Sequence, residues 1–500
     1  MLSRLQLRLA ALRGLRADLA ALGLGALAAA ALPPFHVIPV LLVSVPGLLV
    51  LLDAARSPLA AARRGWWFGF GHHVLGLYWV TEAILFEAAR FWWLVPLAVP
   101  ALAATLALFI AAACFLARLA RPGWPRVLAL AGAWVLADLA RQFALTGFPW
   151  NPWGSVWAIP GAVGDVLIQP AAWIGVHGLT LATLLLAGAA MLRWRWRVAG
   201  AVLLAAWVAG GLVRLQQDIP PQPLTVVLVQ GNVAQGQKWN EDLAVRIFRH
   251  YLDLSAQARV SGPGVVIWPE TAFPGLLDAD EPARRAIALA TGGVPSLIGS
   301  VRFDTRQRPR NSLVAVLDGG GLGGVYDKWH LVPFGEYIPD WLPLPIMVMP
   351  GKGFAAGPGP RTLHVPGLPP LGPLICYEAI FPGEIVDRND RPGWLVNVTN
   401  DAWFGNSTGP RQHLAAARMR AVEEGLPLLR AANTGISAAF DARGHELGRI
   451  GMQATGTLAV ALPGELPPTL FARFGLWVPA ISSSVALGAG LMARRIAAHG

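Results

Sequence analysis

Charged residues are scarce in this 500-residue chain. Asp, Glu, Lys and Arg together make up 14% of it, whereas an ordinary soluble protein has about 25%. Hydrophobic residues make up 55%, so much apolar surface must face something other than water, and at this length that indicates several membrane spans. The two cysteines are too few for a disulfide scaffold. The abundance of Leu, Val and Trp excludes a disordered chain.

Acidic residues are scarcest in the two apolar flanks of the chain. Residues 214–471 contain 22 Lys and Arg and 23 Asp and Glu, and the flanks contain 18 basic and 6 acidic residues. The net charge of +11 therefore comes from the flanks. Basic residues between apolar segments are a signal of membrane topology, and the central part has no basic excess that would indicate binding to nucleic acid.

Eight long apolar stretches predict eight transmembrane helices. They cover roughly residues 17–33, 36–53, 66–83, 93–117, 126–141, 168–192, 197–213 and 474–493. The termini and alternate short loops contain 15 Arg, and the remaining short loops contain only Arg90 and Arg141. This asymmetry predicts cytoplasmic termini and an external central domain, which in a bacterium is periplasmic. The predicted parts are a seven-helix domain (1–213), the external domain (214–471) and a last helix with a short basic tail (472–500).

The external domain alternates short β-branched runs with amphipathic stretches, which predicts an α/β fold. The expected strands are Leu224–Gln230, Val265–Trp268, Ser296–Phe303, Ser312–Leu317, Leu374–Cys376, Trp394–Val398, Ile436–Phe440 and Thr457–Ala461. The expected helices are Glu241–Ala258, Glu281–Ala290 and Gln412–Glu424. Gly and Pro crowd residues 350–373, which predicts a loop there.

Cys376 is the first candidate for chemistry. It ends an apolar run and directly precedes Tyr377 and Glu378. No other cysteine lies in the external domain, so Cys376 has no disulfide partner in a compartment that normally oxidises thiols. The alternative is an inert buried thiol, which we expect for Cys114 within a span. A thiolate nucleophile also requires a base and a partner for the developing oxyanion.

Glu270 and Lys328 are the candidates for those two roles. Glu270 follows a buried run and Pro269, so its carboxylate would stand at a strand end; a cap or a salt bridge is the alternative. Lys328 is unusual because the chain has 37 Arg and only 3 Lys, and a compact ammonium suits an oxyanion better than a guanidinium does. Glu336 follows at a turn, and His330 ranks below Glu270 as a base. No metal-ligand spacing or phosphate-binding Gly loop occurs, so no cofactor is expected.

Three segments resemble, in order, the signature blocks of the nitrilase superfamily. They are Trp-Pro-Glu (268–270), Asp-Lys-Trp-His-Leu-Val-Pro-Phe-Gly-Glu (327–336) and Ile-Cys-Tyr-Glu (375–378). The resemblance implies an α-β-β-α sandwich with a Glu-Lys-Cys triad, here Glu270, Lys328 and Cys376. The separations of 58 and 48 residues between the three fit that family.

With seven spans before this domain and one after it, the whole chain resembles the apolipoprotein N-acyltransferase family of the bacterial inner membrane. Further similar segments are Gln-Gly-Asn (230–232), Phe-Pro-Trp (148–150) and Asn-Asp-Ala-Trp-Phe-Gly (400–405). The resemblance implies that a phospholipid, such as phosphatidylethanolamine, donates an acyl chain to Cys376. The acceptor would be the α-amine of the S-diacylglyceryl-cysteine that begins an apolipoprotein. A monomer is expected.

The resemblance also implies supporting roles beside the triad. Glu336 and Glu378 would position Lys328 and the acceptor amine; the alternative is that each carboxylate is purely structural. The main-chain N–H of Tyr377 would help to stabilise the oxyanion.

Several residues are candidates for contact with the acyl chains. The mainly apolar segment 340–354 contains Met347 and Met349 and would form a lid, or else a loop packed on its own domain. Trp239 would flank the entrance. Trp150 is a further candidate, although aromatic residues at span ends more often mark the membrane interface.

Two other functions remain open. A membrane-tethered, nitrilase-like amidase would share the triad but pass its thioester to water. A non-catalytic scaffold would only bind lipoproteins, but such a module has no need of a nucleophile, base and cation together. A transporter is less favoured, because the intramembrane acids Asp18, Glu82 and Asp138 lie near predicted span ends without relay spacing.

Overall fold

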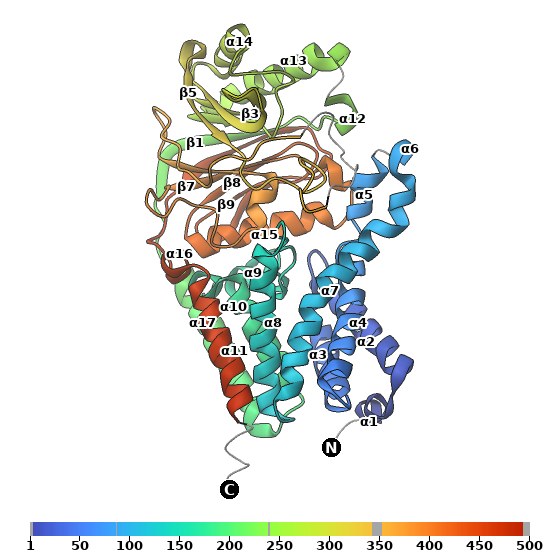
Figure 1. The fold of residues 1–500 in the computed structure, drawn as a ribbon. Helices are drawn as coiled ribbons and strands as arrows, with labels where there is room; N and C mark the ends of the chain where they lie inside the picture. The colour runs from blue at the N-terminus through green and yellow to red at the C-terminus, as the bar shows by residue number, and fades with distance from the viewer. Residues whose placement is uncertain (1–3, 87, 239–240, 343–352, 494–500) are drawn as a thin grey trace. The chain divides into compact units, whose positions relative to one another are not determined.

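The computed structural model describes residues 4–86, 88–238, 241–342 and 353–493. The chain forms two compact units, one of residues Met1–Gln216 with Leu470–Gly500 and one of residues Gln217–Thr469. The first unit is helical and the second contains both sheets (Figure 1).

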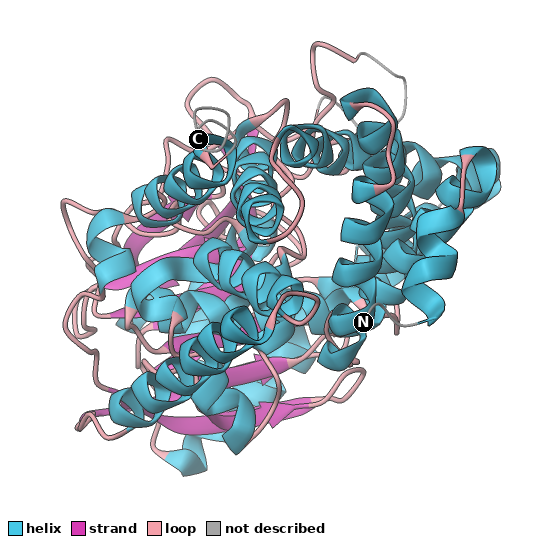
Figure 2. Cartoon of the chain, turned by 90° about the horizontal axis from the view of Figure 1, so that it is seen from below, coloured by secondary structure: helices cyan, strands magenta, loops and turns pink. Residues whose placement is uncertain are grey.

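Each of the eight apolar stretches overlaps a helix of the helical unit, and most of these helices run roughly alongside one another (Figure 2). The helices are α1 (Arg4–Ala11), α2 (Gly14–Ala28), α3 (Leu41–Asp53), α4 (Pro58–Gly76), α5 (Val80–Leu85), α6 (Ala88–Phe91), α7 (Val95–Leu119), α8 (Trp124–Phe143), α9 (Ala162–Leu167), α10 (Ala171–Ala189), α11 (Trp194–Leu215), α16 (Leu470–Phe474) and α17 (Trp477–Met492).

Four helical segments among the described residues are long and apolar enough to cross a membrane. They are Gly14–Ala31, Ala88–Leu119, Ala171–Ala189 and Trp194–Leu215. Ile38–Asp53 and Trp477–Met492 are apolar but shorter. Several apolar helices are therefore present, and the predicted total of eight spans stays a prediction.

Glycines let some of these helices pack closely. A Cβ on Gly25 of α2 would lie 1.9 Å from the carbonyl oxygen of Phe68 on α4. A Cβ on Gly132 of α8 would lie 2.4 Å from the carbonyl oxygen of Ser483 on α17. Small residues at such contacts allow two helix backbones to approach, which is typical of helices packed in a membrane.

The α/β unit contains two sheets that pack face to face. The first has the order β11-β1-β2-β3-β4-β5 and the second the order β10-β9-β8-β7-β6. The strands are β1 (Pro221–Gln230), β2 (Val265–Ile267), β3 (Ser296–Phe303), β4 (Pro309–Val316), β5 (Leu322–Asp327), β6 (Leu371–Ile375), β7 (Trp394–Thr399), β8 (Leu428–Ala432), β9 (Ser437–Phe440), β10 (Glu446–Ile450) and β11 (Gly456–Pro463).

Three hydrophobic clusters build the four layers of this unit. Side chains of both sheets, such as Val226 and Val396, fill the core between them. Helices α13 (Glu241–Ala258) and α14 (Glu281–Thr291) cover the outer face of the first sheet. Helix α15 (Gly409–Glu424) covers the second, and α12 (Gln235–Lys238) is short. The expected α-β-β-α sandwich is confirmed.

The expectation missed β5, β8 and β10. β5 contains two consecutive glycines, and β10 is an edge strand with alternating exposure, so neither has the apolar run of a buried strand. β8 carries Arg430 at its centre. The expected loop 350–373 was wrong at its end, because Leu371 already begins β6, paired with Trp394 of β7.

The carboxyl ends of parallel strands place the candidate residues. β6 is parallel to β7, and β1 is parallel to β2. Glu270 follows β2, Cys376 follows β6, and Asn400 follows β7. Functional groups of α/β proteins commonly gather at the carboxyl ends of parallel strands.

Candidate active site

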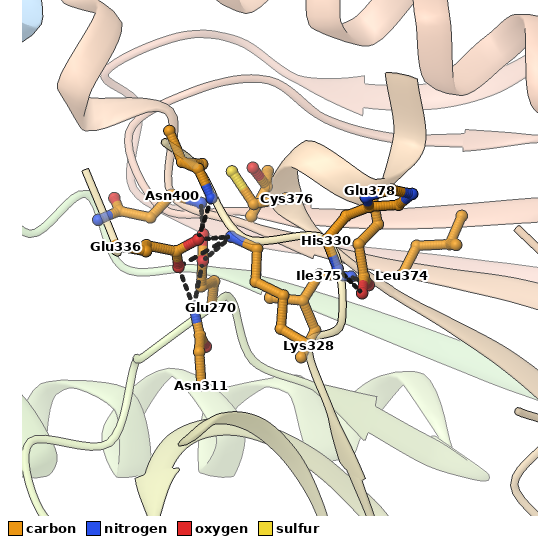
Figure 3. Close-up of polar contacts among 12 residues, drawn as sticks. Glu270, Asn311, Lys328, His330, Glu336, Leu374, Ile375, Cys376, Glu378 and Asn400 are labelled. Carbon is orange, nitrogen blue, oxygen red and sulfur yellow. Dashed lines mark hydrogen bonds and ion pairs between the residues drawn. The ribbon is translucent and has the colours of Figure 1, made fainter. Parts of the chain in front are cut away.

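Glu270 is a buried carboxylate, and both of its oxygens accept hydrogen bonds. Its Oε1 accepts from Asn311 Nδ2 at 2.7 Å, and its Oε2 accepts from the main-chain N–H of Asn400 at 2.8 Å. These donors come from β4 and from the end of β7, so both sheets fix the carboxylate (Figure 3). A carboxylate fixed in this way can accept a proton with little reorganisation.

Lys328 lies directly after β5, and its side chain is only 1% exposed. Its Nζ lies 2.9 Å from a carboxylate oxygen of Glu336 and 3.4 Å from Oε1 of Glu270. Burial opposes the charged form, but these two carboxylates outweigh it and raise the pKa of Lys328 above its ordinary value. Lys328 therefore stays a cation, as an oxyanion partner must.

Cys376 has a left-handed backbone, with φ of 51°. This conformation is uncommon for a residue other than glycine, and it ends β6 one residue before the expected strand end. The side chain is buried beside Lys328 (Figure 3). Burial and the carboxylate of Glu270 raise the pKa of the Cys376 thiol and outweigh Lys328, which lowers it. The resting thiol is thus protonated and needs a base before it can act as a nucleophile.

Glu336 and Glu378 hold Lys328 in different ways. Glu336 contacts the ammonium itself and also accepts from the main-chain N–H of Val332 at 2.8 Å. Glu378 accepts from the main-chain N–H groups of Trp329 at 2.7 Å and Ile375 at 2.6 Å. It therefore ties the segment next to Lys328 to the segment next to the thiol through the main chain.

A Glu378→Gln variant is expected to be less stable, most clearly at low pH. Its amide NH₂ would face one of the two N–H donors, and a buried donor without an acceptor costs about 1–3 kcal/mol. Burial raises the pKa of Glu378 from 4.5 to about 7. This group therefore stabilises the native state fully below pH 4.5 and progressively less as pH rises through 7.

Thermal unfolding of the detergent-solubilised variant and wild type between pH 5 and pH 8 tests this. The deficit of the variant should shrink as the pH rises. Other titrating groups are common to both proteins and cancel in the difference. A deficit that stays constant with pH would show that Glu378 is not the titrating group.

The other predicted residues lie in different surroundings. The ring of Tyr377 packs edge-on against Phe381, with 5.2 Å between centroids. The ring of His330 stacks on Phe381 with 3.6 Å between centroids, and its Nε2 lies 3.6 Å from a carboxylate oxygen of Glu384. Trp150 is buried in the helical unit, with its ring 4.5 Å from that of Trp79. This is not the interfacial exposure expected of an aromatic belt.

Three predicted substrate contacts, Trp239, Met347 and Met349, lie outside the described residues. Most of the predicted lid 340–354 does so too.

Sequence reasoning missed the residues that hold the triad in place. Asn311 donates to both Glu270 and Glu336, but the expected strand began one residue after it. Asn400 was noted only as part of a similar segment. Both asparagines are polar residues at the boundary of an apolar run, and this position is the signal that could have indicated them as site residues. Among the described residues, no group of three His, Cys, Asp or Glu side chains could hold a metal ion.

Comparison with known proteins assigns both parts of the chain to described families. The family model for the apolipoprotein N-acyltransferase N-terminal domain matches residues 24–189. The family model for carbon-nitrogen hydrolases matches residues 225–466.

Curated relatives are similar along nearly the whole chain. An apolipoprotein N-acyltransferase of Rhodopseudomonas palustris is 41% identical over 490 residues, which cover 90% of each chain. That of Bradyrhizobium diazoefficiens is 41% identical and covers 96% of this chain and 95% of its own. Among solved structures, an amidase from Nesterenkonia sp. is 19% identical over 49% of this chain and 92% of its own, with a TM-score of 0.38.

Proposed function

The chain belongs to the apolipoprotein N-acyltransferase family, and from this premise we propose the reaction that its buried triad performs. A fatty acyl chain moves from a membrane phospholipid to the α-amine of the N-terminal S-diacylglyceryl-cysteine of an apolipoprotein. The observation that carries this proposal is the joint presence of both matched regions in one chain, with Glu270, Lys328 and Cys376 gathered in the second.

The first half-reaction forms a thioester. Glu270 accepts the thiol proton, and the sulfur of Cys376 attacks an ester carbonyl of the phospholipid. Lys328, with the main-chain N–H of Tyr377, stabilises the oxyanion of the tetrahedral intermediate. The C–O bond then breaks, the proton held by Glu270 passes to the leaving oxygen, and lysophospholipid departs.

The second half-reaction returns the free enzyme. The α-amine of the acceptor attacks the thioester carbonyl, the C–S bond breaks, and an amide forms. Glu270 takes a proton from the attacking nitrogen and returns it to the sulfur of Cys376. Two successive substrates on one nucleophile give ping-pong kinetics.

Electrostatics support these roles. The raised pKa of Cys376 means that the thiol needs a base, and Glu270 is the carboxylate that raises this pKa most. Lys328 remains charged between Glu270 and Glu336. A buried cation of this kind stabilises developing negative charge far more than an exposed one does.

The distribution of basic residues supports a topology for this reaction. Eight spans would place both termini in the cytoplasm of a bacterial inner membrane, with residues 214–471 in the periplasm. The catalytic domain would then face the outer leaflet, where phosphatidylethanolamine donates and a diacylglyceryl apolipoprotein accepts. Trp150, Trp239, Met347 and Met349 are proposed to contact their acyl chains, and the protein to act as a monomer.

A hydrolase is the second candidate, because the carbon-nitrogen hydrolase match covers the domain that holds the triad. The two functions differ in the fate of the thioester. Purified protein in mixed phospholipid micelles should N-acylate a diacylglyceryl-cysteine peptide and release lysophospholipid. With an Nα-acetylated peptide it should give only one burst of lysophospholipid, equal to the enzyme concentration. Continued release of free fatty acid would instead establish the hydrolase.

A further inference from the structure

A second set of charged groups lies buried behind Cys376. Asp401 follows β7, His413 lies on α15, and Arg430 lies on β8. Asp401 and Arg430 form an ion pair at 2.6 Å, and all three side chains are fully buried. None of the three takes part in the reaction steps above. Because burying charged groups has a desolvation cost, another role is expected for them.

The ring of His413 bonds to the main chain of the nucleophile. Its Nε2 lies 3.0 Å from the carbonyl oxygen of Cys376. A carbonyl oxygen only accepts, so Nε2 carries a hydrogen and donates it. On the other side of the ring, Nδ1 lies 2.9 Å from Asp401 Oδ1 and 3.2 Å from Arg430 Nη2. Both ring nitrogens are therefore occupied by groups other than the thiol.

Asp401 and Arg430 are also connected, through Thr399 and Asn397, to the thiol of Cys376 and to the end of β6. Arg430 hydrogen-bonds Asn397, whose Nδ2 donates to the carbonyl of Leu374 at 3.0 Å. Thr399 donates its hydroxyl to Asp401 at 3.1 Å, and the oxygen of the same hydroxyl can accept from the protonated thiol of Cys376. The contacts to the carbonyl of Leu374, to the carbonyl of Cys376 and to the side chain of Cys376 therefore all lead back to the ion pair of Asp401 and Arg430.

We propose that His413, oriented by Asp401 and Arg430, is a positioning residue that holds the left-handed main chain of Cys376 and so aims its thiol at the acyl carbonyl. The proposal rests on Cys376 being the nucleophile. A left-handed backbone persists at a non-glycine residue only where the surroundings fix it. His413 is not the base, because its Nε2–H is committed to the carbonyl.

The hydrogen bond to Cys376 does not depend on the charge of the ring. Burial and Arg430 lower the pKa of His413, and the carboxylate of Asp401 opposes them. In the neutral ring Nε2 keeps its hydrogen and Nδ1 can accept from Arg430, but not from Asp401, whose oxygen is an acceptor as well. If the ring is protonated, Nδ1 donates to Asp401 and the bond to the carbonyl remains.

Two polar substitutions of His413 distinguish the hydrogen bond made by Nε2 from the contacts made by Nδ1. In His413→Gln the amide nitrogen can occupy the place of Nε2 and donate to the carbonyl of Cys376. In His413→Asn the shorter amide reaches only the place of Nδ1. The Asn variant should lose about 10²-fold in kcat with KM unchanged, because a misplaced reacting group costs about that much. The Gln variant should stay within about tenfold of the wild type.

Alkylation of Cys376 by iodoacetamide in a Cys114→Ala background gives a readout independent of acyl transfer. It should slow in His413→Asn and stay near the wild-type rate in His413→Gln. Equal alkylation and acylation rates in wild type, Gln and Asn would overturn the proposal, as would equal losses in Gln and Asn. Absence of acyl transfer in every protein, with this order of alkylation rates, would overturn the proposed function but keep the positioning role.

A spectroscopic signature reports the hydrogen bond itself. The chain has two cysteines, so ¹³C-carbonyl cysteine in the Cys114→Ala background labels Cys376 alone. The labelled carbonyl should absorb at higher infrared frequency in His413→Asn than in the wild type or His413→Gln. An unchanged band in the folded Asn variant would contradict the bond.

Arg418→Gln is the matched control. Arg418 lies on the same helix and donates from a buried Nε to the carbonyl of Gly444 at 2.7 Å. Its loss should lower the unfolding temperature without slowing alkylation of Cys376. If it slows alkylation as much as His413→Asn does, the effect of His413 is one of general stability and the proposal fails.

Discussion

A Cys376→Ser variant is expected to lose acyl transfer by at least about 10⁴-fold while remaining folded, as removal of a catalytic nucleophile commonly does. A hydroxyl is far less acidic than a thiol, and the carboxylate of Glu270 is too weak a base to activate it. Lysophospholipid release should fall with acyl transfer, because both depend on attack by the same sulfur. Radiolabelled phospholipid, with separation of lysolipid and acylated peptide, measures the two products together.

Cys114→Ala is the control for this substitution. Cys114 lies on α7 within the helical unit, where its side chain packs against Gly65. Its replacement should leave the rate unchanged. If Cys376→Ser retained lysophospholipid release, another group would have to perform the first half-reaction, and the assignment of the nucleophile would be wrong.

A Lys328→Met variant is expected to lose about 10²–10³-fold in kcat, the usual cost of removing one oxyanion partner. It should also be less stable by roughly 3–5 kcal/mol, because Glu270 and Glu336 would remain buried without their cation. Repulsion between the two carboxylates favours uptake of a proton. Protonation of Glu270 would remove the base as well. Steady-state kinetics and thermal unfolding measure both effects.

The double variant Lys328→Met/Glu336→Gln separates stability from catalysis. Removing one carboxylate together with the ammonium should restore much of the stability but none of the rate. Arg420→Met is the matched control, because Arg420 is a buried cation paired with Glu423 at 2.9 Å on α15. It should destabilise the protein while kcat per folded molecule stays unchanged. Recovery of kcat in the double variant would contradict the role of Lys328.

Much of the fold could be predicted from runs of similar residues in the sequence. Apolar runs located helices in all eight expected stretches, and β-branched runs located most strands of the α/β unit. β5 was missed because it contains two consecutive glycines and only Tyr326 of it is buried, and β8 was missed because Arg430 interrupts its apolar residues. The left-handed conformation of Cys376 was also unforeseen, and its carbonyl contacts His413 of α15, 37 residues further along the chain.

Two candidate site residues could be selected from the sequence because their residue types are rare in this chain. The single cysteine of the external domain indicated Cys376, and the presence of only three Lys beside 37 Arg drew attention to Lys328. Asn311, Asp401, His413 and Arg430 carry no comparable signal, because their contacts in the site join residues from different parts of the chain. Glu378 was expected, with Glu336, to position Lys328 and the acceptor amine, and its carboxylate accepts from the main-chain N–H groups of Trp329 and Ile375.

Intact-mass spectrometry after incubation with a diacyl phospholipid tests the central claim most directly. The wild type should gain the mass of one acyl chain on Cys376. Hydroxylamine should remove the adduct, as it does for thioesters, and a diacylglyceryl-cysteine peptide should discharge it onto the peptide amine. Cys376→Ser should gain none. Folded wild-type protein that turns over both substrates without an adduct on Cys376, even when the acceptor is withheld, would contradict the account.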